Sequence, residues 1–154
     1  MSRATRHART AAAAILAVAV AGCGSSRTPA PTEQQQVKQV LRSYLRAQTS
    51  GDGQTACSLL SNAAQRQLEA LVLQAGKGLL RAPPSCQDAV GLVRAVGGAK
   101  LLNGLANAQI SRVRVQGDKA TAQVVDGTAF SPQQVSLQRS GSSWRITGVP
   151  ALSG

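Results

Sequence analysis

The 154-residue chain is poor in aromatic residues and contains a single histidine. Tyr44, Phe130 and Trp144 are its only aromatic side chains, so a hydrophobic core must be built from Leu, Val, Ile and Ala. The only histidine, His7, lies close to the N-terminus. Catalytic sets that use histidine as the base, such as Ser-His-Asp or Cys-His, are therefore excluded from the rest of the chain.

Acidic residues are also few, and they number 6 against 17 Lys and Arg residues. Asp52 and Asp88 stand at positions typical of helix caps, and Asp118 and Asp126 at positions typical of tight turns. Glu69 has the phase of a solvent-facing helical residue, and Glu33 lies in a polar linker. General acid-base catalysis requires titratable groups that are placed together in a cleft. The sequence therefore predicts a non-catalytic protein without a cofactor.

No apolar run reaches the length of about 18 residues that indicates a membrane-spanning helix. A basic N-terminus without acidic residues precedes the uncharged run 11–21, which is the layout of a secretory signal. The next residues, Val20-Ala21-Gly22-Cys23, resemble the lipobox of bacterial lipoproteins. This resemblance implies that residues 1–22 are removed and that Cys23 carries lipid, including palmitate, at the extracytoplasmic face of the cell membrane. The alternative is an ordinary secretory signal, which would leave Cys23 in a pro-region or as a free thiol.

The basic excess does not come from this leader. Only Arg3, Arg6 and Arg9 precede Cys23, so 14 basic residues and all 6 acidic residues follow it and the formal charge is still +8. Such a charge favours an anionic membrane surface or an acidic envelope polymer as a partner. Nucleic acid is not expected as a partner of an exported chain.

Cys57 and Cys86 remain once Cys23 is assigned to the lipid. An even pair of cysteines in an exported protein predicts one disulfide. Closing a loop of about 30 residues is expected to stabilise the fold by roughly 3 to 4 kcal/mol. Two cysteines without a histidine cannot fill a tetrahedral zinc site, so no metal is expected.

The mature chain divides into a tether at 23–36, one domain at 37–149 and a short tail at 150–154. The tether, which contains GSSRTPAPTEQQQ, has no aliphatic residue larger than alanine and cannot bury enough surface to fold by itself. The domain begins with an apolar stripe at helical spacing, which consists of Val37, Val40, Leu41, Tyr44 and Leu45. This first helix is expected to end at 50–53.

Further helices are expected after the capping residues Asp52, Ser61 and Ser85. The third helix should place Leu68, Leu71 and Val72 inward. The fourth helix, from Cys86 to Gly97-Gly98, should place Val90, Val93 and Val96 inward. A further helical turn or two is expected before residue 108. Beyond it the apolar period changes to two, and four hairpin-linked strands are expected at 112–115, 120–125, 135–137 and 144–146. This order predicts an α+β fold, with N-terminal helices packed on a C-terminal antiparallel sheet.

Three segments together resemble the nuclear transport factor 2-like (cystatin-like) superfamily: VKQVLRSYLRAQTSGDGQTACSLLS, SCQDAV, and the late hairpins VRVQGDKATAQV and VSLQRSGSSWRI. The resemblance implies a cone in which a curved sheet wraps the first helix and leaves a pocket. Tyr44 and Trp144 would line this pocket if they do not pack in the core. Residues 77–108 are longer and richer in glycine than the usual connection in this superfamily.

This superfamily contains enzymes, ligand binders and interaction modules, so the fold implies no single activity. The mature chain lacks the histidine that enzymatic members place in the cone. We therefore expect a non-catalytic, lipid-anchored binding or protein-interaction module of the cell envelope. The alternatives are a small-ligand carrier or enzyme that uses the cone pocket, and an assembly factor recruited by charge.

Overall fold

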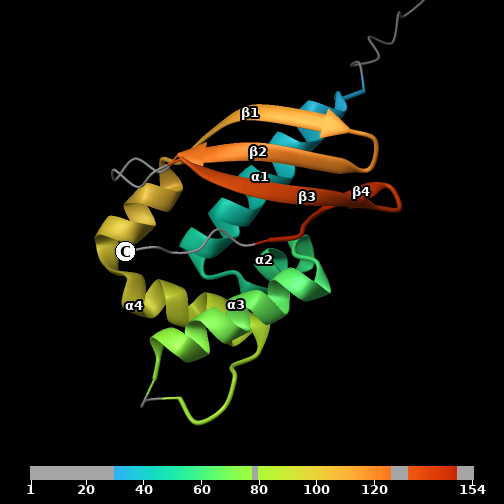
Figure 1. Cartoon of the computed structure of the whole chain (residues 1–154). Helices are drawn as coiled ribbons and strands as arrows, with labels where there is room; N and C mark the ends of the chain where they lie inside the picture. The colour runs from blue at the N-terminus through green and yellow to red at the C-terminus, as the bar shows by residue number, and fades with distance from the viewer. Residues whose placement is uncertain (1–29, 78–79, 126–131, 149–154) are drawn as a thin grey trace, which may run out of the picture.

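A computed structural model describes residues 30–77, 80–125 and 132–148 (Figure 1). These residues form an α+β fold in which four helices pack against a four-stranded antiparallel sheet, as predicted. The expected leader at 1–22, the lipidation site Cys23, most of the tether, the turn at Asp126-Gly127 and the tail at 150–154 lie outside the described residues.

Helix α1 spans Glu33–Ser50 and carries the predicted apolar stripe into the core. It begins four residues before Val37, so residues 33–36 belong to this helix and not to a tether. The reason is a capping box, in which the Thr32 side chain accepts a hydrogen bond from the Gln35 backbone N–H and the Gln35 side chain accepts one from the Thr32 N–H. The helix ends at Gly51, which has a φ of 75° that favours glycine.

Two shorter helices follow at the predicted caps. Helix α2 spans Gly53–Leu59 and is capped by the Asp52 side chain, and α3 spans Asn62–Ala75 and is capped by Ser61. The Ser61 backbone N–H also donates to the Ile146 carbonyl oxygen at 2.8 Å, while Leu60 forms an isolated bridge with Ile146. The connection between α2 and α3 is therefore fixed to the last strand of the sheet.

Helix α4 spans Cys86–Ala106, with Ser85 as its cap. It is not straight, because Gly98 has a φ of 63° and a ψ of 175°. This combination is essentially restricted to glycine. The predicted end at Gly97-Gly98 is thus a kink between two helical segments. The disulfide between Cys57 and Cys86 joins α2 to the start of α4, with the Cα atoms 6.1 Å apart, which confirms the predicted pairing.

The sheet is an antiparallel meander with the strand order β1-β2-β3-β4. Its strands span Gln109–Gln116, Lys119–Val125, Gln133–Ser140 and Ser143–Ile146. The register between β1 and β2 shifts between Ser111 and Arg114, where Arg112 has a φ of 48°. This irregularity is a β-bulge of the kind that bends a strand. Arg112 and Arg114 are exposed, as their alternation with Val113 and Val115 predicted.

The core lies between α1, the inner face of the sheet and the first half of α4. Its most fully buried large side chains come from these three parts of the fold: Leu41, Leu137, Ile146, Val37 and Val90. None of the helices in the described part of the chain is long and apolar enough to cross a membrane.

Candidate functional site

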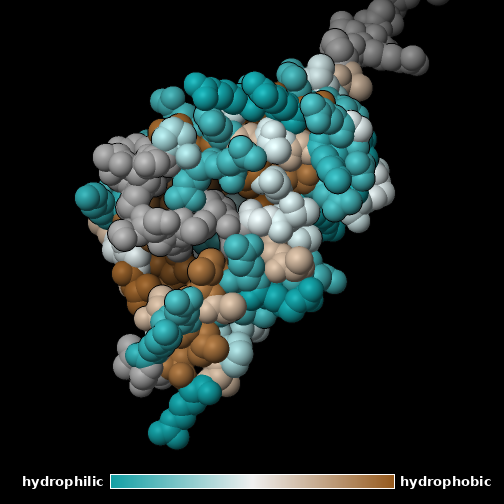
Figure 2. Space-filling model, viewed as in Figure 1, coloured by the Kyte–Doolittle hydropathy of each residue, from teal (hydrophilic) through white to brown (hydrophobic). Residues whose placement is uncertain are grey.

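An apolar groove of about 340 Å³ lies between α3 and α4. Every described residue of its lining is Leu, Val, Ala or Gly: Leu68, Leu71, Val72, Ala75, Gly76, Leu80, Leu92, Val93, Val96, Gly97 and Leu101. Figure 2 shows hydrophobic surface, in brown, gathered in the part of the molecule where Figure 1 draws α3 and α4. A concave apolar surface of this size is typical of a binding site.

The shape of the groove depends on two glycines. A Cβ atom on Gly76 would lie 2.8 Å from Leu80 Cδ1, and one on Gly97 would collide with Leu101 Cδ2. Both leucine side chains therefore lie directly against glycine backbone, in space that a larger residue would occupy. Gly97 also precedes the kink at Gly98, which sets the direction of the segment that carries Leu101.

Val96 lies on this groove and is 80% exposed. The prediction that it faces the core with Val90 and Val93 is wrong. Helical spacing places these residues on neighbouring positions of one face, but α3 covers only part of that face. A large apolar side chain that is left exposed beside other apolar residues indicates an interaction surface.

The groove has basic residues beside it. Lys77, Arg81 and Lys100 each adjoin a lining residue in the sequence and are exposed. None of them takes part in an ion pair within the described residues. The groove thus combines an apolar interior with cationic side chains that are free to meet an anionic group.

Two further cavities lie beside strand β4. One, of about 620 Å³, lies between the start of α3 and strands β3 and β4, and its lining includes Arg139 and Arg145. The other, of about 430 Å³, lies between α1 and β4, and Trp144 forms part of its wall. Trp144 therefore contributes to a cavity wall although it is only 2% exposed.

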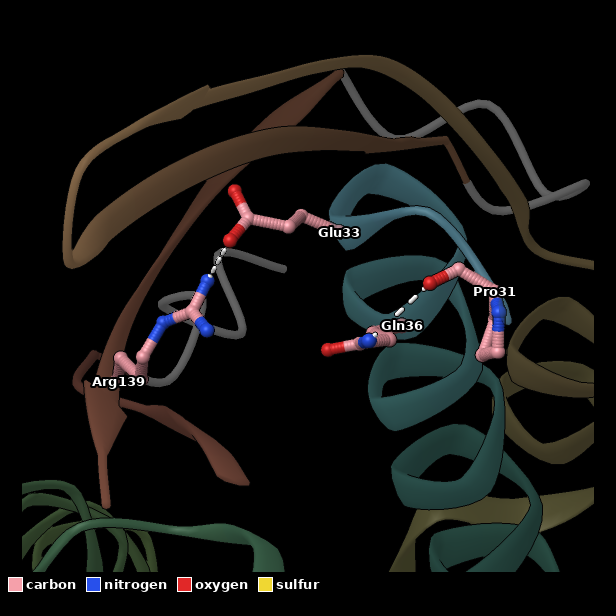
Figure 3. Close-up of polar contacts among 4 residues, drawn as sticks. All are labelled: Pro31, Glu33, Gln36 and Arg139. Carbon is pink, nitrogen blue, oxygen red and sulfur yellow. Dashed lines mark hydrogen bonds and ion pairs between the residues drawn. The ribbon is translucent and has the colours of Figure 1, made fainter. Parts of the chain in front are cut away.

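Arg139 connects this region to the start of α1. Its guanidinium lies over the Trp144 ring, 4.7 Å from the ring centroid, and donates to the Glu33 carboxylate (Figure 3). The Gln36 side-chain amide donates to the Pro31 carbonyl oxygen at 3.2 Å in the same region. The Arg139–Glu33 ion pair joins the N-terminal end of α1 to β3, whereas the Gln36–Pro31 hydrogen bond is local to the start of the helix. Both are structural contacts, and the two charges of the ion pair are partly exposed.

Tyr44 lies in the core and lines none of the three cavities described above. Its hydroxyl accepts a hydrogen bond of 2.8 Å from the Gln48 side-chain amide. Burial raises the pKa of Tyr44 to about 12, although the hydrogen bond from Gln48 opposes this effect. Tyr44 and Trp144 therefore both pack in the core, which is one of the two roles that the sequence left open, and Trp144 also contributes to the wall of the 430 Å³ cavity.

Stability is expected to fall as the pH rises through the interval from about 10 to about 12. The Tyr44 hydroxyl stays protonated to a higher pH in the folded state than in the unfolded state. Its contribution to the free energy of unfolding is therefore complete below pH 10 and is lost as the pH approaches the pKa of the folded state. The shift corresponds to about 2–3 kcal/mol. Urea unfolding across this interval measures the effect. The Tyr44→Phe variant should lack this part of the alkaline loss, and an equal loss in both proteins would contradict the assignment.

The acidic residues are not gathered into a reactive site in the described structure. Asp52 caps α2, and the hydrogen bonds from Thr55 hold the pKa of its carboxyl below the usual value. Asp88 accepts a hydrogen bond from the Ser85 hydroxyl at the start of α4. No group of three or more His, Cys, Asp or Glu residues within the described ranges is placed to hold a metal ion.

The sequence predicted some of the lining residues, Leu68, Leu71, Val72, Val93 and Val96, as core positions, but it did not predict the groove. A surplus of Leu, Val and Gly over 68–101 was the available signal, and the glycine-rich character of residues 77–108 marked the same region. Comparisons of the chain with protein-family models, with curated proteins and with solved structures found no match.

Proposed function

We propose that the chain is a non-catalytic, lipid-anchored binding module of the bacterial cell envelope and that the groove between α3 and α4 is its binding surface. The groove is the observation that carries this proposal, because its lining is apolar and Val96 on it is 80% exposed. An interaction surface explains why a small domain with few aromatic residues leaves such side chains uncovered.

The anchoring part of the proposal is supported by the sequence at Cys23 and by the disulfide. Disulfides persist in oxidising compartments, which include the space outside the bacterial cytoplasmic membrane. The start of α1 lies at one end of the molecule, and α3 lies at the opposite end (Figure 1). A domain held through Cys23 would therefore present the groove away from its point of attachment.

We further propose that the domain has the cone-like arrangement of the nuclear transport factor 2-like superfamily. A long first helix packed against the inner face of an antiparallel sheet supports this proposal. A small-ligand carrier or enzyme that uses the cone pocket is the alternative, and it finds less support because Tyr44 lies in the core. The 620 Å³ cavity, whose lining includes Arg145, instead favours an anionic polymer as a second candidate ligand.

The anchor is tested by replacing Cys23 with alanine in the full chain. We expect the wild-type chain to take up a palmitate analogue in living cells and to remain with the membrane fraction. The Cys23→Ala chain should carry no label and should move to the soluble fraction, since each buried CH2 group of the lipid contributes about 0.8 kcal/mol to membrane binding.

Ser26→Ala is the matched control, because it changes a nearby small polar residue and keeps the thiol. It should behave as the wild-type chain does. If the wild-type chain takes up no label and Cys23→Ala fractionates in the same way, the anchor is contradicted.

A further inference from the structure

We infer that the groove between α3 and α4 holds the acyl chain of an anionic lipid. This inference rests on the proposed function and names the class of ligand for the same site. The apolar lining would contact the hydrocarbon chain of such a lipid. The basic residues beside the groove would bind its anionic headgroup.

The lining selects for hydrocarbon. All of its described residues are Leu, Val, Ala or Gly, so none of their side chains offers a hydrogen bond to a ligand inside the groove. A polar ligand would lose its hydrogen bonds to water there without replacement. The volume of about 340 Å³ is near the lower end of the range of small-molecule pockets. It suits a single chain better than a bulky ring system or several chains.

The charges around the groove select for an anionic headgroup. Between residues 66 and 101 the basic residues outnumber the acidic ones: Arg66, Lys77, Arg81, Arg94 and Lys100 against Glu69 and Asp88. Arg94 is engaged in a hydrogen bond to the Ser50 carbonyl oxygen. Lys77, Arg81 and Lys100 carry no ion pair within the described part of the chain, so they remain available to a carboxylate or phosphate.

The same charges argue against a second copy of this chain as the occupant. Two groove surfaces brought together would place these cations near one another, and like charges at an interface are unfavourable. The α3 side of the groove also lies at the end of the molecule opposite the start of α1 (Figure 1). The membrane of attachment would lie near the start of α1. A lipid in the groove would therefore be presented to the envelope and away from the anchoring surface.

The test uses the full chain with Cys23→Ala, so that no lipid of its own competes for the groove. Dodecanoate, dodecanol and dodecylamine are titrated below their micelle-forming concentrations, by calorimetry and by NMR of the methyl groups. We expect dodecanoate to bind most tightly, dodecanol more weakly and dodecylamine most weakly. The methyl resonances of Leu71, Val96 and Leu101 should shift on binding.

Two variants locate the site. Val96→Glu places a carboxylate on the groove at an exposed position and is expected to weaken dodecanoate binding by about tenfold or more. Gln116→Glu adds the same charge on the exposed end of β1, away from the groove, and should leave binding unchanged. Circular dichroism of both variants shows whether the fold is retained.

Replacing Lys77, Arg81 and Lys100 together by glutamine should reduce the affinity for dodecanoate to that for dodecanol. Equal affinity for all three amphiphiles in the unmodified groove would overturn the anionic part of the inference. No binding, or shifts confined to residues outside the groove, would overturn it completely. A groove that rejects dodecanoate but binds an acidic amphipathic peptide, or that dimerises the chain, would assign the site to protein. These outcomes are independent of palmitate labelling at Cys23, which tests the anchor alone.

Discussion

Removal of the Cys57–Cys86 disulfide is expected to lower the free energy of unfolding by about 2–5 kcal/mol. The bond closes a loop with a sequence separation of 29, for which chain entropy alone predicts about 3–4 kcal/mol. It joins α2 to the first turn of α4, and both cysteines are buried. Since small domains are stable by only about 5–15 kcal/mol, this loss is a large fraction of the total.

The double variant Cys57→Ala/Cys86→Ala measures this loss by urea denaturation followed by circular dichroism. Alanine avoids placing a hydroxyl group in the buried positions of the two sulfur atoms. Adding a reductant to the wild-type protein should reproduce most of the loss, and adding it to the double variant should change nothing. A double variant as stable as the oxidised wild-type protein would contradict the stabilising role of the bond.

Trp144→Ala is expected to lower the free energy of unfolding by about 3–5 kcal/mol. Trp144 is the only tryptophan of the chain and is almost fully buried on β4. Its truncation leaves a cavity between β4 and α1 and removes the ring that lies beneath the Arg139 guanidinium. The Glu33–Arg139 ion pair at the start of α1 would also lose the support of this ring.

Trp144→Phe is the matched variant, because it keeps a ring and removes mainly volume. The indole N–H makes no hydrogen bond in the described structure, so its removal breaks none. We expect Phe to retain most of the stability that Ala loses. Unfolding must be followed by circular dichroism, since both variants lack the fluorescent indole. Equal losses for Phe and Ala would show that the contribution comes from the indole itself and not from the filled space.

The helices were largely predictable because their signals are local. Asp52, Ser61 and Ser85 cap three helices through their own side chains, and the apolar stripe of α1 is complete within its own sequence. The hairpins were equally readable from alternation and glycine turns. Capping and alternation involve residues within a few positions of one another, so one chain suffices to recognise them.

The groove was not predictable because its formation depends on how distant elements meet. Val96 has the helical phase of a core residue, but whether α3 reaches it depends on the packing of α3 against α4. The direction of the last segment of α4 depends on the backbone at Gly98, and glycine alone does not specify which torsions are used. The start of α1 at Glu33 was missed because the polar sequence before Val37 obscured the capping box.

Both borders of the sheet are poorly suited to recruiting another strand. Strand β1, which forms one border, carries the bulge at Arg112 in its pairing with β2 and two exposed arginines, features that natural sheets use to discourage edge-to-edge aggregation. At the opposite border, β4 is only four residues long, and its end is occupied by the backbone of Leu60 and Ser61. Crowded copies of this domain on a shared surface would therefore remain separate folded units and would not fuse into a continuous sheet.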